Sequence, residues 1–149
     1  MKIAIISDVH SNIEAFKAVL KDINERRCDV ILCLGDLVGY YYWPEEVVNL
    51  LMNTDNVYAI KGNHEEMYFE SLSDLKYKES INKKYGSGID YACDKISNNS
   101  LSYLKGLKSS MDLTLDGKNL GMFHGSPFSI DQYVYPDSNQ ETFFNVTNN

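Results

Sequence analysis

The sequence predicts an α/β fold with a mainly parallel sheet. Three short apolar runs are typical of buried strands, and the two stretches between them carry apolar residues at helical spacing. The chain of 149 residues has the size of one domain, and an apolar share of 44% argues against wholesale disorder. We therefore expect residues 1–149 to form a single domain.

The first strand and helix are predicted at the N-terminus. Lys2 to Ser7 is a continuous apolar run, typical of a strand covered on both faces. Ser11 to Glu14 fits a capping box in which Ser11 caps the helix and Glu14 reaches back. Apolar residues then follow helical spacing from Ile13 to Ile23, and the polar run Asn24 to Arg27 ends the helix.

The same alternation continues along the chain. Asp29 to Leu34 predicts a second buried strand that contains Cys33 as a small buried hydrophobe. Pro44 suits the first turn of a helix with an apolar face from Val47 to Leu51. Val57 to Ile60 predicts the third strand.

The second half of the chain is predicted to be helical first and then to form a hairpin. The polar, Lys-rich segment from Glu65 to Ser109 is expected to be mostly helical, with one break at Gly86 and Gly88. The runs Met111–Asp116 and Lys118–Phe123 flank Asp116-Gly117, which is a two-residue hairpin signal. After His124 no regular element is predicted.

Composition excludes some classes of function. The chain has 21 Asp and Glu against 14 Lys and Arg, a net charge of −7, so general nucleic-acid binding is not expected. A small phosphate ester held through a bound cation stays compatible with this charge. No apolar run is long enough for a membrane span or a signal peptide, and the three cysteines lack metal-site spacing. We expect a soluble, cytoplasmic protein.

Side chains that can bind metals follow the predicted strands. Because ligands in α/β sheets bind outside the carboxyl ends of the strands, we expect these residues at one rim. An extended backbone could aim Asp8 and His10 the same way. An isolated Asp after a strand is usually a cap, and an isolated His is usually structural, but all three His of the chain fall at strand ends. The whole set is Asp8, His10, Asp36, Asn63, His64, Glu65 and His124.

Carboxylates, imidazoles and an amide oxygen together suit Mn²⁺, Fe²⁺ or Zn²⁺. The central Asp36 is the candidate to bridge two ions. Such a pair would hold a phosphoryl group, generate hydroxide and stabilise an in-line displacement. A sugar- or nucleotide-binding domain without metal is an alternative hypothesis, but the chain has no glycine-rich phosphate loop to support it.

Four ordered motifs, spread over residues 1–127, resemble the calcineurin-like metallophosphoesterases. They are Asp8-Val9-His10, Gly35-Asp36 with Gly39, Gly62-Asn63-His64-Glu65, and His124-Gly125. The stretch Ser11 to Ala15 and the aromatic-rich run Gly39 to Pro44 further resemble small bacterial members described as phosphodiesterases or serine/threonine-phosphatase-like proteins. The resemblance implies an α/β sandwich of two sheets flanked by helices.

The resemblance also implies roles for the site residues. Asp8 and His10 would bind the first metal, Asp36 would bridge both, and Asn63 and His124 would bind the second. His64 would protonate or polarise the leaving oxygen, and Glu65 would orient His64. The implied reaction is attack of a metal-bound hydroxide on a phosphomonoester or phosphodiester. The cofactors would be two divalent ions, Mn²⁺ first, with Fe²⁺, Zn²⁺ or Ni²⁺ as alternatives.

The sequence departs from the family in one respect: the family's last motif, Gly-His-x-His, is absent, and no His follows His124. We expect a C-terminal truncation that leaves the second sheet incomplete. A partner chain that completes the site, a homo-oligomer, and a catalytically silent scaffold that binds a protein partner are the alternatives. The aromatic run from Tyr40 to Trp43 could stack on a nucleobase or an aromatic leaving group, but lining the core is the interpretation we favour.

Overall fold

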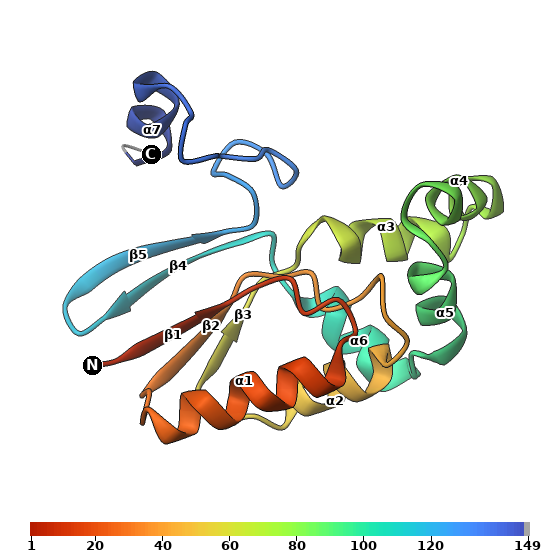
Figure 1. The fold of residues 1–149 in the computed structure, drawn as a ribbon, viewed down its shortest axis with the longest axis horizontal. Coiled ribbons are helices and arrows are strands. Elements are labelled where there is room, and N and C mark those ends of the chain that lie inside the picture. Colours follow the sequence, from red (N-terminus) through yellow and green to blue (C-terminus); the bar gives the residue numbers. More distant parts are fainter. Residues whose placement is uncertain (148–149) are drawn as a thin grey trace.

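A parallel sheet and an antiparallel hairpin form the strand layers of the protein. The structure is a computed structural model that describes residues 1–147. Strands β1 (Ile3–Ile6), β2 (Val30–Cys33) and β3 (Val57–Ala59) form a parallel sheet in the order β1-β2-β3. Strands β4 (Ser110–Leu115) and β5 (Lys118–Phe123) form a separate antiparallel pair (Figure 1). The predicted α/β class with two sheets is confirmed.

Helices α1 (Ile13–Glu25) and α2 (Pro44–Met52) are the crossovers between the parallel strands and cover one face of the sheet (Figure 1). The predicted Pro44 start of α2 is confirmed. The predicted cap of α1 is wrong, because Asn12 and not Ser11 accepts the hydrogen bond from the Ala15 N–H. The Ser11 backbone instead bonds across to the neighbouring loop, with its N–H 2.7 Å from the Leu37 carbonyl oxygen.

The main core lies between this helix pair and the sheet. Its fully buried side chains include Phe16, Leu37, Val47 and Leu51. Cys33 is 0% exposed among them, as predicted for a small hydrophobe. Each such side chain contributes about 1.5–3 kcal/mol through removal from water.

A helical arm follows β3. It consists of α3 (Asn63–Ser71), α4 (Leu75–Tyr85), α5 (Gly88–Lys95) and α6 (Asn98–Gly106). The single predicted break at Gly86 is present, with a left-handed φ of 82°. Two further breaks were not predicted, and the side chains of Asp74 and Ser97 cap the helices that follow them.

The hairpin has the predicted two-residue turn. Asp116 and Gly117 both have positive φ, 53° and 73°, which matches the right-handed twist of the strands it joins. A small second core of Val30, Leu32, Ile60 and Met122 connects the hairpin to the parallel sheet. An isolated parallel bridge between Ile60 and Lys108 adds to this connection.

The face of the parallel sheet that looks toward the hairpin is only partly covered. The prediction of a strand buried on both faces holds for β2 but is wrong for β1, because Ile5 is 66% exposed. An open groove of about 730 Å³, lined by Ile5, Leu32, Leu113 and other apolar residues, lies between the two sheets. Helix α7 (Gln140–Thr147), which the sequence did not predict, lies at the far end of the chain. No helix within residues 1–147 could cross a membrane.

Candidate metal centre

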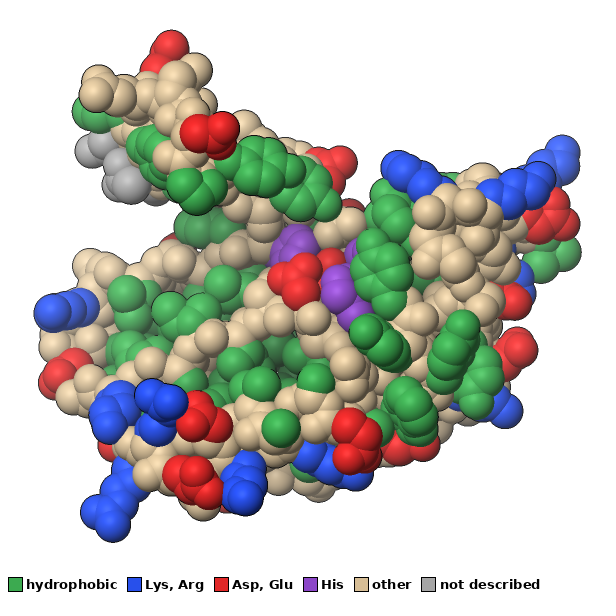
Figure 2. All heavy atoms as spheres, viewed as in Figure 1, with side chains coloured by type: hydrophobic (Ala, Val, Ile, Leu, Met, Phe, Trp, Pro, Cys, Tyr) green, Lys and Arg blue, Asp and Glu red, His purple; other side chains and the backbone are tan. Residues whose placement is uncertain are grey.

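Six of the seven predicted site residues line one pocket of about 400 Å³ at the carboxyl ends of the strands. Figure 2 shows His and acidic side chains together in this hollow, between the end of the hairpin and the helical arm. The loop after β1 is held against the loop after β2 by backbone bonds. The Asp8 N–H donates to the Gly35 carbonyl at 3.1 Å, and the His10 N–H donates to the Asp36 carbonyl at 2.9 Å. The lining members of the set are Asp8, His10, Asp36, Asn63, His64 and His124.

The backbone at the site is left-handed at several residues other than glycine. Asp8, His10, Ser11 and Asp36 have φ of 58°, 47°, 61° and 56°. The expectation that an extended backbone aims Asp8 and His10 alike is therefore wrong, although both reach the pocket. Such conformations cost of the order of 1 kcal/mol each and persist where the surroundings enforce them, which is typical of functional sites.

Asp36 lies at the centre of the cluster. Its Oδ2 is 3.7 Å from His10 Nε2 and 3.5 Å from His124 Nε2, and its Oδ1 accepts the His64 backbone N–H at 2.9 Å. The side chain is only 3% exposed, and burial raises the pKa of Asp36 to about 6. Two groups of ligand atoms share this carboxylate: Asp36 with His10 and His64, and Asp36 with Asp8 and His124.

The two flanking imidazoles are oriented by backbone carbonyls. Nδ1 of His10 is 3.0 Å from the Val38 carbonyl oxygen, and Nδ1 of His124 is 2.7 Å from that of Leu34. A carbonyl oxygen only accepts, so each Nδ1 carries a proton, and in the neutral ring this leaves the lone pair on Nε2, which faces Asp36. This is the tautomer that a metal ligand needs.

The donor set fits a divalent cation. Nε2 of His124 lies 2.9 Å from Asn63 Oδ1 and 3.5 Å from Asp36 Oδ2, so a neutral His124 ring brings three potential ligand atoms together. On the other side, His10 Nε2 lies 3.5 Å from Asp8 Oδ1. No Lys or Arg of the described chain lines this pocket to balance the carboxylates. Oxygen and imidazole ligands around a shared carboxylate suit Mn²⁺, Fe²⁺ or Zn²⁺.

Glu65 lies behind the pocket and contacts the backbone rather than His64. Oε1 accepts N–H bonds from Leu37 at 2.8 Å and Val38 at 3.1 Å, and Oε2 accepts from Asp36 at 2.9 Å and Gly62 at 2.7 Å. The prediction that Glu65 orients the His64 ring is therefore wrong. Burial and the charge of Asp36 raise the pKa of Glu65 to about 7, while the four N–H donors favour the carboxylate.

Glu65 thereby joins two loops that carry site residues. The loop after β2 holds Asp36, and the loop after β3 holds Asn63. The loops approach so closely that a Cβ at Gly62 would overlap Asp36 Oδ1, which explains glycine at that position. Glu65 is a positioning residue, and the local sequence signal for this role was its place three residues after Gly62, as in a capping box.

His64 is the most buried of the three imidazoles, with 3% of the residue exposed. Burial and the neighbouring His10 lower the pKa of His64 to about 4, so the ring is neutral at neutral pH. Its Nδ1 has no hydrogen-bond partner among the described residues and lies against Gly39, where a Cβ would overlap it.

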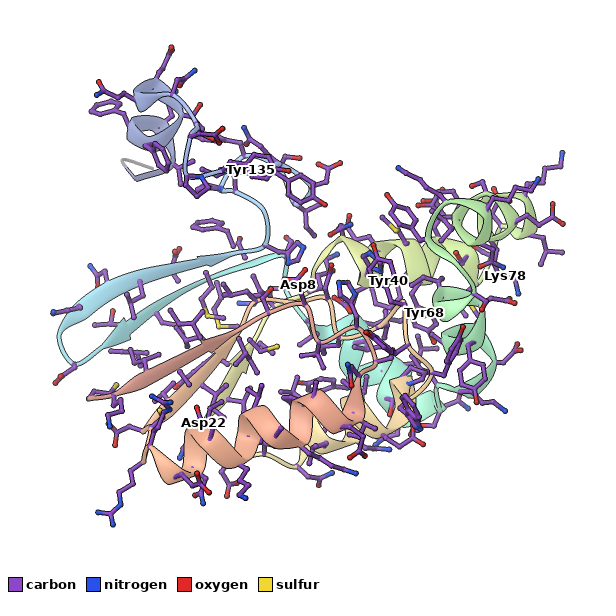
Figure 3. The ribbon with its side chains drawn as sticks, viewed as in Figure 1. Asp8, Asp22, Tyr40, Tyr68, Lys78 and Tyr135 are labelled. Atoms are coloured by element: carbon purple, nitrogen blue, oxygen red, sulfur yellow. The ribbon has the colours of Figure 1, made fainter. Side chains whose placement is uncertain are left out.

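The aromatic run after Gly39 is on the surface. Tyr40, Tyr41, Tyr42 and Trp43 are 45%, 48%, 48% and 42% exposed, so the interpretation that they line the core is wrong. Tyr40 lines the pocket together with Asp8, and both residues are labelled in Figure 3. Sequence reasoning also missed Tyr85 and the segment Ile130 to Val134, which line the same pocket from distant parts of the chain.

Comparisons with known proteins agree with this fold. The family model for the calcineurin-like phosphoesterases matches residues 1–147. Protein MJ0912 of Methanocaldococcus jannaschii is 37% identical over 146 residues, which are 95% of this chain and 57% of that protein. The chain therefore spans a little over half the length of this relative.

Solved structures give the same result. A metallophosphoesterase from Sphaerobacter thermophilus is 33% identical with a TM-score of 0.69, over 91% of this chain and 51% of that one. Protein PH1004 from Pyrococcus horikoshii has a TM-score of 0.84 at 22% identity, over 97% of this chain and 63% of that one, and supports the fold alone. The family match over residues 1–147 agrees with this fold and with the candidate ligands around Asp36. The chain belongs to the calcineurin-like phosphoesterase family.

Proposed function

We propose that this chain hydrolyses phosphomonoesters or phosphodiesters at a two-metal site. The observation that carries the proposal is the buried Asp36 carboxylate, whose Oδ2 lies between two imidazoles, 3.7 Å from His10 Nε2 and 3.5 Å from His124 Nε2. Asp8 and His10 are the proposed ligands on one side of Asp36, and Asn63 and His124 are those on the other. The proposed cofactors are two divalent ions, Mn²⁺ first, with Fe²⁺, Zn²⁺ or Ni²⁺ as alternatives.

Bound at these ligands, the ions would polarise the phosphoryl oxygens and lower the pKa of the attacking water. The chain's own residues prepare the site for this role. The carbonyls of Val38 and Leu34 keep the Nε2 lone pairs of His10 and His124 directed inward. Glu65 holds the loops of Asp36 and Asn63 together, which fixes the spacing between these two residues.

His64 is the proposed catalytic residue next to the leaving group. Its low pKa means that the ring is neutral at neutral pH and carries one N–H. That N–H can donate a hydrogen bond to the leaving oxygen as negative charge develops on it. The ring is held in place by its contact with Gly39 and by an edge-on contact with His10, with ring centroids 4.4 Å apart.

The first test separates metal binding from turnover. Purified chain is loaded with Mn²⁺, and bound metal and hydrolysis of p-nitrophenyl phosphate and bis-p-nitrophenyl phosphate are both measured. Asp36→Asn is expected to lose bound metal and activity together. His64→Ala is expected to keep metal and lose activity by about 10²-fold or more. Glu66→Gln, on the exposed side of α3, serves as the control with unchanged values.

The alternative, a catalytically silent scaffold, makes a different prediction. Full metal loading without turnover on a broad panel of phosphate esters would reject the hydrolase proposal and favour the scaffold. Absence of stoichiometric metal binding in the wild type would reject the two-metal site itself.

A further inference from the structure

The pocket has a second wall that the metal centre does not use. Tyr40 comes from the loop after β2, and Tyr85 is the last residue of α4. The Tyr40 ring lies 4.6 Å from the His10 ring and 4.9 Å from the His64 ring, measured between centroids. Tyr85 lies 5.7 Å from His64 and 6.3 Å from Tyr40. We call Tyr40 and Tyr85 the tyrosine wall.

Tyr40 is held at this place by an unfavourable backbone conformation. Its φ is 50°, in the left-handed region that bulky residues rarely adopt. The start of α5 packs against it so closely that a Cβ at Gly88 would overlap the Tyr40 backbone. Despite this constraint the residue keeps 45% of its surface exposed, and it lines the pocket. Strain that presents a ring to a pocket, rather than burying it in the core, indicates a binding role.

The charges around the pocket limit what can lie against the tyrosine wall. The described lining residues include Asp8, Asp36 and Asp131 and no Lys or Arg. Lys84 lies over the Tyr85 ring at 4.8 Å and lines a neighbouring hollow instead. Asp8 and Asp36 are proposed metal ligands, so a second phosphate or a carboxylate on the substrate, away from the metals, would meet Asp131 without a side-chain cation in this pocket to pair with.

The distances place the wall next to the phosphate position. The imidazoles of His10 and His64 contact both the Asp36 cluster and the Tyr40 ring. A phosphoryl group at Asp36 thus brings the group attached to it within contact distance of Tyr40. A flat, uncharged ring is the group that gains most there, since it can stack on or pack edge-on against tyrosine.

We infer that the tyrosine wall is a binding subsite for a neutral planar aromatic group, a nucleobase or an aryl ring, carried by a substrate with a single phosphate. This inference rests on the proposed phosphoesterase function for the position of the phosphate. It adds the chemical class of the organic part of the substrate, which the metal ligands do not determine.

The test measures ligand binding rather than turnover. Calorimetry of the full chain with Mn²⁺ compares phenylphosphonate with methylphosphonate, which have no ester bond to hydrolyse. A second pair, adenosine 5′-monophosphate and ribose 5-phosphate, can be hydrolysed and is therefore measured in the His64→Ala background, with and without the Tyr40 substitutions. Tyr40→Leu keeps an apolar side chain but removes the ring, and Tyr40→Phe keeps the ring.

Tyr42→Leu is the matched control. Tyr42 is 48% exposed, close to the 45% of Tyr40, but its ring packs against that of Tyr91, with centroids 5.3 Å apart, and it does not line the pocket. We expect Tyr40→Leu to reduce the preference for the aromatic ligand of at least one pair by about tenfold, which corresponds to stacking of about 1.4 kcal/mol. Tyr40→Phe and Tyr42→Leu are expected to keep the preference within about twofold.

The outcomes separate the two proposals. A Tyr40-dependent preference in the phenyl pair identifies an aryl subsite, and one in the nucleotide pair identifies a nucleobase subsite. Equal weakening of both members of each pair by Tyr40→Leu, or no aromatic preference in the wild type, overturns the subsite. Lack of hydrolysis on any ester, with the Tyr40-dependent preference intact, would reject the phosphoesterase and leave the subsite standing.

Discussion

Replacing Glu65 by Gln tests whether one buried carboxylate joins the two ligand loops. The side chain is 0% exposed and each oxygen accepts two backbone N–H groups. A Gln amide has one acceptor oxygen and one NH₂ group, so two of these N–H groups face a donor. Glu65→Gln is nearly isosteric and leaves the packing around it intact.

The expected loss of stability follows from those two groups. A buried N–H that loses its acceptor costs about 1–3 kcal/mol, so two cost about 2–6 kcal/mol. Removing the carboxylate also removes the cost of burying its charge, a cost that its pKa of about 7 reflects, and this offsets part of the loss. We expect a net destabilisation of about 3 kcal/mol, which is large against the 5–15 kcal/mol of a typical domain.

Urea denaturation followed by circular dichroism at pH 8 with a metal chelator measures this loss without a contribution from bound metal. At that pH Glu65 of the wild type is ionised, because its pKa is about 7. In a thermal melt under the same conditions, the melting temperature of Glu65→Gln should be lower than that of the wild type by roughly 6–12 °C. In a separate titration the variant should bind Mn²⁺ about 10–100-fold more weakly, since the loops of Asp36 and Asn63 are no longer joined.

The neighbouring residue supplies the control. Glu66 has a 46% exposed side chain and an ion pair with Lys61 at 3.2 Å, so Glu66→Gln should cost no more than about 1 kcal/mol. The positioning role of Glu65 is refuted if the free energies of unfolding of Glu65→Gln and Glu66→Gln differ by less than about 1 kcal/mol. It is also refuted if Glu65→Gln binds Mn²⁺ with the affinity of the wild type.

Two further predictions follow from buried side chains, and a third from the close approach of two loops. Burial raises the pKa of the fully buried Cys33 thiol to about 12. Iodoacetamide at pH 8 should therefore label the partly exposed Cys28 and spare Cys33, as measured by mass spectrometry. Equal labelling of the two cysteines would contradict this prediction. Burial also raises the pKa of Tyr68 to about 12 from 10.0, so the unfolded chain loses this proton first and stability should fall as pH rises above 10. Denaturation measured at several pH values should show a smaller fall in stability for Tyr68→Phe than for the wild type. The same dependence of stability on pH in both proteins would contradict this prediction. Gly62→Ala should weaken Mn²⁺ binding in a calorimetric titration, because its Cβ would overlap Asp36 Oδ1; wild-type affinity would show that the loop can relax.

Local patterns predicted the strand and helix order well, because burial periodicity and turn chemistry act over a few neighbouring residues. The run Val30–Cys33 is buried throughout as its continuous apolar pattern indicated, and Asp116-Gly117 forms the predicted turn. The cap of α1 was displaced by one residue, since the Ser11 backbone is bound by Leu37 from another loop. Such a bond between distant segments leaves no trace in the capping pattern.

Exposure of the first strand shows the same limit. The apolar run Ile3–Ile6 reads as a buried strand, yet Ile5 is 66% exposed because it lines the open groove between the two sheets. A parallel-strand pattern predicts that a segment can be buried on both faces. Which part of a face is covered depends on where the hairpin packs, which is a tertiary property.

The sequence alone was enough to predict the candidate ligands: Asp8, His10, Asp36 and Asn63 follow three strands of a parallel sheet, whose carboxyl ends meet at one rim, and His124 follows the hairpin. How that rim is built depends on the tertiary structure. It placed Glu65 against four backbone N–H groups rather than against His64, and it brought Tyr40 and Tyr85 beside the imidazoles. The physical reason is that strand-end positions follow from local periodicity, whereas these contacts depend on how closely loops far apart in the chain approach each other.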